Sequence, residues 1–226
     1  MRLWIKICGN TSLADAQLAV EAGADAVGFV FAPSPRRMTP IDVAGIVPHL
    51  AAEVEKIGIF VDADPQEICS TVLACGLTGV QLHFEAAPDL PLKLRERLGP
   101  SVRILRVVHF GIESAGQIAD RIAEHTRNPH VDAVLVDSRT AGVVGGTGVA
   151  FDWAAARETL FRGREEAKLI AAGGLHPGNV GLAIATLRPW GVDAVSGVEA
   201  APGRKDPVKV REFVARARAA ERESKE

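Results

Sequence analysis

The chain has 226 residues, 47% of them apolar, with a formal net charge of −2 and three cysteines. This length and composition suffice for one domain with a large core, and the small net charge gives no reason to expect nucleic acid as a partner. There is no apolar run near the roughly 20 residues of a membrane span, no signal peptide and no disulfide spacing, so we expect a soluble, cytoplasmic protein.

Short apolar runs alternate with amphipathic stretches along the whole chain. The predicted strands are 3–7, 26–31, 56–61, 78–82, 102–108, 132–136, 167–171 and 193–196. The predicted helices are 12–22, 40–50, 65–75, 88–98, 113–125, 151–161, 177–187 and 207–220. These strand and helix units predict a single parallel (β/α)₈ TIM barrel over residues 1–220, with a charged, frayed tail at 221–226. The alternative is an open, doubly wound sheet.

A cysteine ends the first predicted strand. Lys6-Ile7-Cys8 closes the apolar run, Gly9-Asn10 breaks it, and Ser12 can cap the following helix. Barrels build active sites at the C-terminal ends of their strands, so Cys8 could be a catalytic base or nucleophile. Lys6 is close enough in sequence to lower the pKa of the thiol if it points the same way. The competing interpretation is a small buried apolar residue, which is the commoner role of a cysteine.

Arginines follow the second predicted strand, in the proline-stiffened segment Pro33-Ser34-Pro35-Arg36-Arg37. An arginine can hold a carboxylate or a phosphate through two parallel hydrogen bonds. A solvated surface arginine is the simpler interpretation of this segment alone.

A carboxylate ends the sixth predicted strand, at Asp137-Ser138, and a glycine-rich loop follows at 142–148. A carboxylate at the end of an apolar strand is costly unless it is paired or used. Asp137 could therefore serve catalysis or cap a neighbouring turn, and the segment favours neither role.

Small residues follow the last two predicted strands, as Gly173-Gly174 and as Ser196-Gly197. Backbone N–H groups at such loops can bind a phosphate, and phosphate sites in barrels lie after strands seven and eight. The same glycines would also suit ordinary turns.

Other chemically interesting residues give weaker signals. Cys69 and Cys75 do not share a face of their predicted helix, and His83 ends the fourth predicted strand without an assigned role. The histidines lack metal-ligand spacing, so no metal is predicted. No P-loop or dinucleotide motif occurs in the context it requires, so no cofactor is predicted either.

Taken in order, the segments of this chain resemble the phosphoribosylanthranilate isomerases from residue 3 to about residue 206. The resemblance lies in Lys6-Ile7-Cys8-Gly9, Gly23–Phe31, Ser34-Pro35-Arg36, Gln81-Leu82-His83, Asp137-Ser138, Gly145-Gly146-Thr147-Gly148, Phe151-Asp152-Trp153, Ala172-Gly173-Gly174-Leu175 and Ser196-Gly197-Val198-Glu199. It implies a (β/α)₈ barrel of tryptophan biosynthesis. Such an enzyme converts N-(5-phosphoribosyl)anthranilate to 1-(2-carboxyphenylamino)-1-deoxyribulose 5-phosphate, an Amadori rearrangement without metal or organic cofactor.

The resemblance also implies roles for single residues. Cys8 matches the general base, Asp137 the general acid and Arg36 the arginine that holds the anthranilate carboxylate. The phosphate loops match Gly173, Gly174, Ser196 and Gly197. The chain departs from the family at Phe84, where glycine is usual. The segment before Ser34 is also shorter, so Arg37 could take the role of Arg36, although the position of Thr39-Pro40 favours Arg36.

Two other classes of function fit parts of the pattern. A phosphosugar lyase or aldolase that forms a Schiff base needs a lysine in its pocket, but only Lys6 lies near a strand end, and Lys168 starts a strand. A barrel that binds a phosphorylated ligand without turnover would not need Cys8 and Asp137. We therefore expect an isomerase that acts on a small phosphosugar–anthranilate substrate, without nucleic acid or membrane partners, as a monomer or homodimer.

Overall fold

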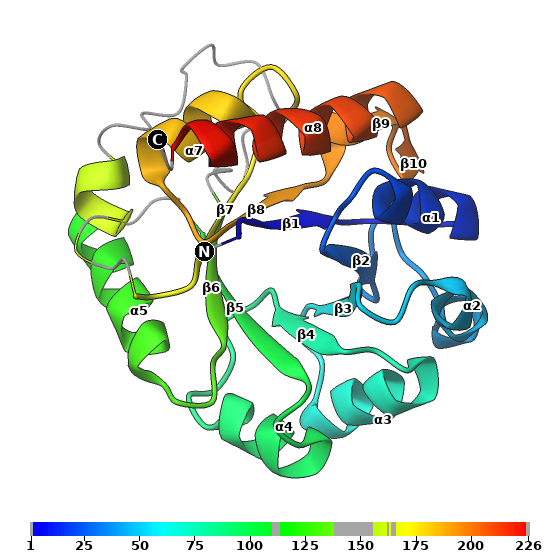
Figure 1. Ribbon diagram of the computed structural model, residues 1–226. Coiled ribbons are helices and arrows are strands. Elements are labelled where there is room, and N and C mark those ends of the chain that lie inside the picture. Colours follow the sequence, from blue (N-terminus) through cyan, green and yellow to red (C-terminus); the bar gives the residue numbers. More distant parts are fainter. Residues whose placement is uncertain (1, 110–113, 138–155, 162, 164–165, 225–226) are drawn as a thin grey trace.

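The centre of the molecule is a closed barrel of parallel strands, paired in the order β1 to β8 (Figure 1). The computed structural model describes residues 2–109, 114–137, 156–161, 163 and 166–224. The strands are β1 Trp4–Ile7, β2 Ala26–Val30, β3 Glu55–Phe60, β4 Gly79–Leu82, β5 Arg103–His109, β6 Ala133–Asp137, β7 Leu169–Ala172 and β8 Gly191–Ala194. Because β8 pairs with β1 and closes the ring, the predicted barrel is confirmed and the open sheet is wrong.

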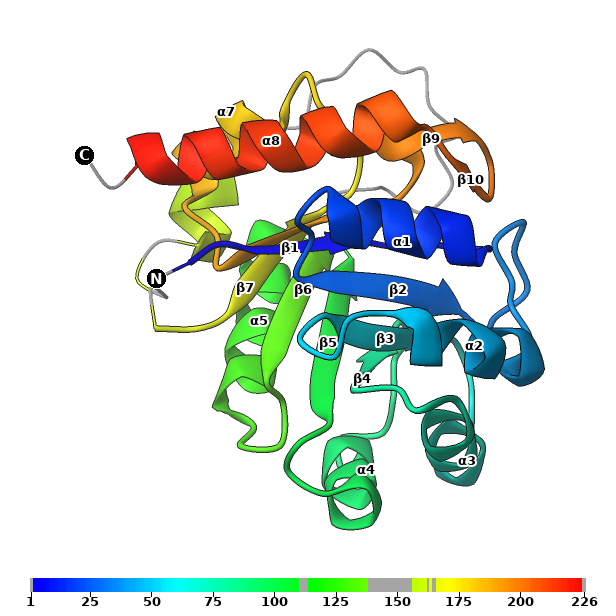
Figure 2. The same ribbon diagram turned by 45° about the vertical axis from the view of Figure 1, so that its right-hand side comes forward.

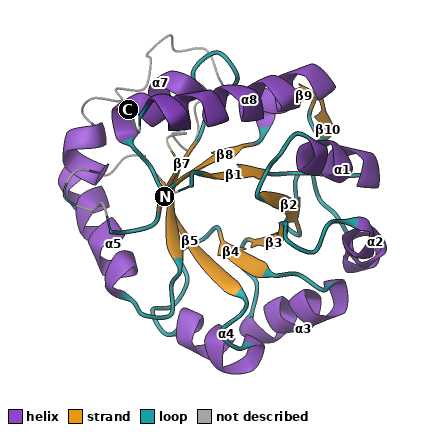
Figure 3. Cartoon of the chain, in the orientation of Figure 1, coloured by secondary structure: helices purple, strands orange, loops and turns teal. Residues whose placement is uncertain are grey.

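Helices surround the strands on the outside of the barrel (Figure 3). They are α1 Leu13–Glu21, α2 Pro40–Ile46, α3 Pro65–Cys75, α4 Leu90–Leu98, α5 Ala115–Arg127, α7 Val180–Leu187 and α8 Pro207–Glu223, with the short turns η1 Val47–His49, η2 Arg157–Phe161 and η3 Ser196–Val198. Side-chain oxygens accept from backbone N–H groups in the first turns of α1, α2, α3, α5 and α8, from Ser12, Thr39, Asp64, Ser114 and Asp206. Of the helix predicted at 151–161, only the part from residue 156 lies within the described residues. No helix in the described part of the chain has the length and apolar character needed to cross a bilayer.

The last strand of the barrel begins earlier than predicted. β8 starts at Gly191, which pairs with Trp4 of β1, and it ends at Ala194. Ser196 therefore lies in η3 and not in a strand. A small antiparallel hairpin of β9 (Glu199–Ala201) and β10 (Arg204–Lys205) follows, and its strands are too short for periodicity to reveal.

The C-terminal helix continues to Glu223, three residues beyond the boundary predicted at 220. Its last turn is held by contacts that are distant in sequence. The Glu221 carboxylate accepts a hydrogen bond from the backbone N–H of Leu3 at 3.0 Å, and Arg218 donates to the carbonyl of Leu3. The end of α8 therefore packs beside the start of β1 (Figure 2).

Strand alternation sorts the core into two parts. Residues facing outward pack under the helices in one large apolar cluster. Residues facing inward fill the barrel, among them Leu105 and Val107 of β5 and Leu135 of β6. The same alternation places His109 and Asp137, each two residues further on, at the C-terminal mouth of the barrel.

Candidate active site

An open pocket with a cavity volume of about 210 Å³ lies at the C-terminal ends of the strands. The residues predicted for the site all line it, namely Cys8, Arg36, Asp137, Gly173, Gly174, Ser196 and Gly197. The fold therefore brings together residues from five separate regions of the sequence.

Cys8 directly follows β1 and is buried, with its N–H donating to the Ala194 carbonyl at 2.9 Å. Lys6, two residues earlier, points to the same inner side, and its Nζ lies 3.0 Å from Asp193 Oδ1 of β8. Both partners of this ion pair are buried. Gly28 of β2 makes room for them, because a Cβ there would lie 2.6 Å from the Cys8 Sγ and 3.1 Å from the Lys6 Cε.

Opposing effects set the ionisation of Cys8. Burial raises the pKa of the thiol above its ordinary value; the charges of Lys6 and Lys205 act to lower that pKa, and Asp193 acts to raise it. Burial dominates, so the neutral thiol prevails at neutral pH. Lys6 therefore lowers the pKa of Cys8, as the sequence predicts, but burial raises that pKa by more. Burial also opposes the charge on Lys6, but Asp193 and Cys8 more than offset it and raise the pKa of Lys6.

Arg36 lines the pocket, and the Glu199 carboxylate holds its guanidinium in place. Its Nε and one terminal nitrogen donate to the two Glu199 oxygens at 2.8 and 2.6 Å, a bidentate pair. Lys205 Nζ also contacts Glu199, at 3.2 Å, and donates to the Cys8 carbonyl at 2.6 Å. Burial acts to raise the pKa of Glu199, but Arg36 and Lys205 lower it overall, so Glu199 is a carboxylate. Arg37 is exposed and does not line the pocket.

Asp137 is the last residue of β6 and is buried. It extends a strand that is separated from β1 by β7 and β8, so Asp137 and Cys8 face the pocket from different sides. Ser138 and the predicted glycine loop at 142–148 lie outside the described residues.

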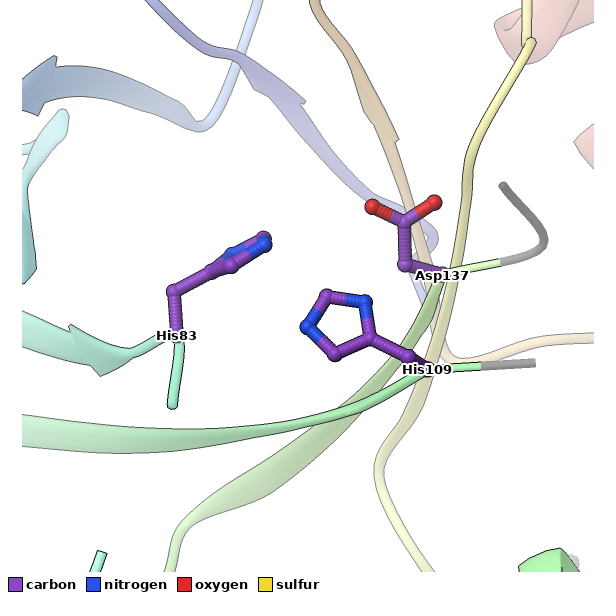
Figure 4. Close-up of side chains that lie close together, drawn as sticks. All are labelled: His83, His109 and Asp137. Atoms are coloured by element: carbon purple, nitrogen blue, oxygen red, sulfur yellow. The ribbon is translucent and has the colours of Figure 1, made fainter. Parts of the chain in front are cut away.

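Two histidines lie beside Asp137 at the mouth of the barrel (Figure 4). His109 of β5 is the register partner of Asp137, and His83 directly follows β4. Their ring centroids are 4.8 Å apart, and one potential ligand atom from each of His83, His109 and Asp137 lies within 4.8 Å of the other two. The sequence spacing gave no sign of this cluster, because its members come from three different strands.

The loops after β7 and β8 form the part of the pocket predicted to bind phosphate. Gly173 and Gly174 turn the chain after β7 with positive φ angles of 86° and 64°. Gly197 packs so closely against this loop that a Cβ would lie 2.0 Å from the Leu175 carbonyl oxygen. Only glycine fits at position 197, and the two loops form one continuous wall of the pocket.

Sequence reasoning missed the partners of the residues that it found. Asp193 and Lys205 are buried around Cys8, and Glu199 holds Arg36. A buried charge requires a partner, so Lys6 within an apolar strand was a signal that an acidic residue must face it.

Comparisons with known proteins point to one family. The family model described as "N-(5'phosphoribosyl)anthranilate (PRA) isomerase" matches residues 5–216. A curated N-(5'-phosphoribosyl)anthranilate isomerase of Desulforudis audaxviator is 41% identical over 96% of this chain and 98% of its own length. A solved phosphoribosyl anthranilate isomerase of Thermotoga maritima has a TM-score of 0.81 and 35% identity over 96% of this chain and 100% of its own.

A further solved phosphoribosyl anthranilate isomerase was crystallised with reduced 1-(o-carboxyphenylamino)-1-deoxyribulose 5-phosphate. It has a TM-score of 0.79 and 34% identity, and the match covers 96% of this chain and 100% of that one. Sequence and fold thus agree over nearly the whole length. This chain belongs to the N-(5'-phosphoribosyl)anthranilate isomerase family.

Proposed function

We propose that the protein isomerises N-(5-phosphoribosyl)anthranilate to 1-(2-carboxyphenylamino)-1-deoxyribulose 5-phosphate in tryptophan biosynthesis, by general acid–base catalysis. The observation that carries the proposal is one pocket lined by a thiol, a carboxylate, an arginine and the two small-residue loops. Family membership supplies the reaction. We expect the enzyme to work in the cytoplasm as a monomer or homodimer.

The reaction begins with opening of the furanose ring. Asp137, in its protonated form, donates a proton to the ring oxygen, and the C1′–O bond breaks to give an open-chain Schiff base. The position of Asp137 at the end of β6, lining the pocket, supports this role.

Cys8 then removes the C2′ proton as a thiolate. The resulting enolamine tautomerises to the ketone, so no covalent adduct forms with the sulfur. Lys6 and Lys205 lie where they favour the thiolate over the thiol. Cys8 and Asp137 face the pocket from different sides, which suits an acid and a base acting on two faces of one sugar.

The remaining pocket residues hold the two ends of the substrate. Arg36 is assigned to the anthranilate carboxylate, because its guanidinium lines the pocket and Glu199 fixes its plane. The backbone at Gly173, Gly174, Ser196 and Gly197 is assigned to the phosphate. Both assignments draw on the family resemblance and on the position of these residues.

A Schiff-base lyase or aldolase fits the pocket less well. None of the described residues that line it is a lysine. Lys6 is fully buried in its pair with Asp193, and the pKa of Lys6 is raised, so its amine is not a nucleophile at neutral pH.

The direct test is a fluorescence assay that follows the loss of phosphoribosylanthranilate on addition of the purified protein. We expect turnover that depends on enzyme concentration and stops in a Cys8→Ser, Asp137→Asn double variant. Absence of turnover at micromolar enzyme would contradict the proposed activity.

A further inference from the structure

The cluster of His83, His109 and Asp137 has the composition of a transition-metal site. It contributes two imidazoles and one carboxylate from the ends of β4, β5 and β6, three neighbouring strands of the barrel. Figure 4 shows the Asp137 carboxylate standing next to the His109 ring, with the His83 ring extending toward both. His83 and Asp137 also line the pocket, so the cluster borders open space.

This donor set favours zinc over the common hard cations. Imidazole suits Zn²⁺, whereas Mg²⁺ and Ca²⁺ take oxygen ligands. Zinc sites that exchange ligands use three protein donors and leave the fourth position to water or substrate, and the pocket supplies that position. Zinc bonds of about 2.0–2.2 Å require tetrahedral donors about 3.4 Å apart. The donor atoms already lie within 4.8 Å of one another, so modest side-chain rotations complete the geometry.

A second observation concerns Gln81 of β4, whose side chain contacts His83. Its Nε2 is 3.2 Å from His83 Nδ1. Its Oε1 is buried and has no hydrogen-bond partner among the described residues. If the amide turns over, Oε1 accepts from Nδ1–H and the lone pair of His83 Nε2 becomes available to a metal. Metal-binding histidines are usually held by such a hydrogen bond from their second nitrogen.

We propose that His83, His109 and Asp137 form a Zn²⁺ site and that zinc bound there inhibits the enzyme. A carboxylate that coordinates zinc carries no proton, so Asp137 cannot protonate the ring oxygen while the metal is bound. The inhibitory effect rests on the proposed function of Asp137, whereas zinc binding itself does not.

Zinc binding is tested first without substrate. Metal-free protein is titrated with Zn²⁺ by calorimetry, and with Co²⁺ as a spectroscopic probe whose visible absorption reports imidazole coordination. We expect His109→Gln and His83→Gln each to lower the zinc affinity at least about 10-fold. The matched control is His49→Gln, which removes an exposed histidine far from the mouth and should leave the affinity unchanged. Circular dichroism confirms that each variant is folded. Equal zinc affinity in the wild type and both cluster variants would overturn the site.

Inhibition is tested second, in the isomerase assay. Zinc should inhibit the wild type reversibly, with activity restored by EDTA, and His109→Gln should resist the same zinc concentration while retaining its activity without metal. A wild type that binds zinc at the cluster yet keeps full activity would overturn the inhibitory role. If the wild type is inactive even without metal, the proposed function is refuted. The zinc site is then judged only from the calorimetric comparison of the wild type with the histidine variants.

Discussion

Cys8 is surrounded by charges of both signs within an apolar barrel, and this determines how it can act. Lys6 and Lys205 favour the thiolate, while burial and Asp193 favour the thiol. A base that is mostly protonated at rest is a strong base when it does ionise, because its conjugate acid is weak. Asp137, the proposed acid, lines the same pocket.

Substitution of the acid or the base should act on turnover. Positioned acid–base groups each supply about 10²–10⁴-fold, so we expect Cys8→Ser and Asp137→Asn to lower kcat by that factor with little change in KM. Steady-state kinetics measures both constants. Cys69→Ser, a buried cysteine of α3 outside the pocket, is the control. Near-native kcat in either active-site variant would remove that residue from the mechanism.

The raised pKa of Cys8 predicts how the thiol ionises with pH. The thiolate fraction grows as pH rises toward a pKa above the ordinary thiol value of about 8.5. We therefore expect the ultraviolet thiolate absorbance of the wild type, taken as the difference from Cys8→Ser, to keep rising above pH 8.5. A plateau reached well below that pH would mean that the surrounding lysines outweigh burial in the folded protein.

Substitution of Arg36 should act on substrate binding. A hydrogen-bonded charge pair contributes about 1.5–3 kcal/mol, so we expect Arg36→Ala to raise KM about 10- to 100-fold, with kcat changed much less. Arg37→Ala, one residue further along and exposed, is the matched control and should keep the native KM. An unchanged KM in Arg36→Ala would move the carboxylate contact to another residue.

Residues at strand ends could be predicted from the sequence, and their partners could not. Cys8 and Asp137 each close an apolar run, which local patterning reveals. The Lys6–Asp193 and Arg36–Glu199 contacts join positions 187 and 163 residues apart. Which strand ends meet, and which side chains there touch, depends on the register of the closed barrel, which no short window of sequence contains.

At the scale of elements, α1, α2, α3 and α8 begin within one residue of the prediction because their start signals are local, whereas α4, α5 and α7 begin two or three residues later than predicted. Ser12, Thr39 and Asp64 each accept from the backbone of the helix that follows. The C-terminal ends of β1 to β7 also agree with the prediction within one residue. The exceptions are β8, which is shifted by two residues to pair with β1, and the hairpin of β9 and β10, which was missed.

The packing of α5 on β5 makes one histidine sensitive to acid. Burial, assisted by the charge of Arg106 on β5, lowers the pKa of His125 to about 4. The unfolded chain binds this proton near pH 6.5, so the neutral histidine contributes stability that is present above pH 6.5 and lost as pH falls to about 4. As pH falls from about 6.5 to about 4, the wild type should lose stability that His125→Gln does not lose. Urea titrations at several pH values should therefore show the free energy of unfolding of His125→Gln rising relative to that of the wild type. His49→Gln should run parallel to the wild type; parallel behaviour of His125→Gln would contradict the assignment.

At the scale of the whole molecule, the barrel closes through the buried Lys6–Asp193 pair between β1 and β8. Removing one partner strands the other charge, so we expect Lys6→Met or Asp193→Leu alone to destabilise the fold by about 3–5 kcal/mol. The double variant should be much less destabilised than the sum, because neither charge remains. Urea unfolding of the four proteins measures the coupling, and additivity within about 0.5 kcal/mol would show that the pair is not coupled.

The hydrogen bonds between Leu3 and the last turns of α8 hold the start of β1 beside the end of the last helix. They lie at the start of β1, on the face of the barrel opposite the pocket. A circularly permuted protein, with a short linker from α8 to β1 and new ends in the exposed turn at 52–53, would retain all the strand pairings and the complete mouth. Because the barrel is closed, its strand pairings do not depend on which strand comes first in the chain.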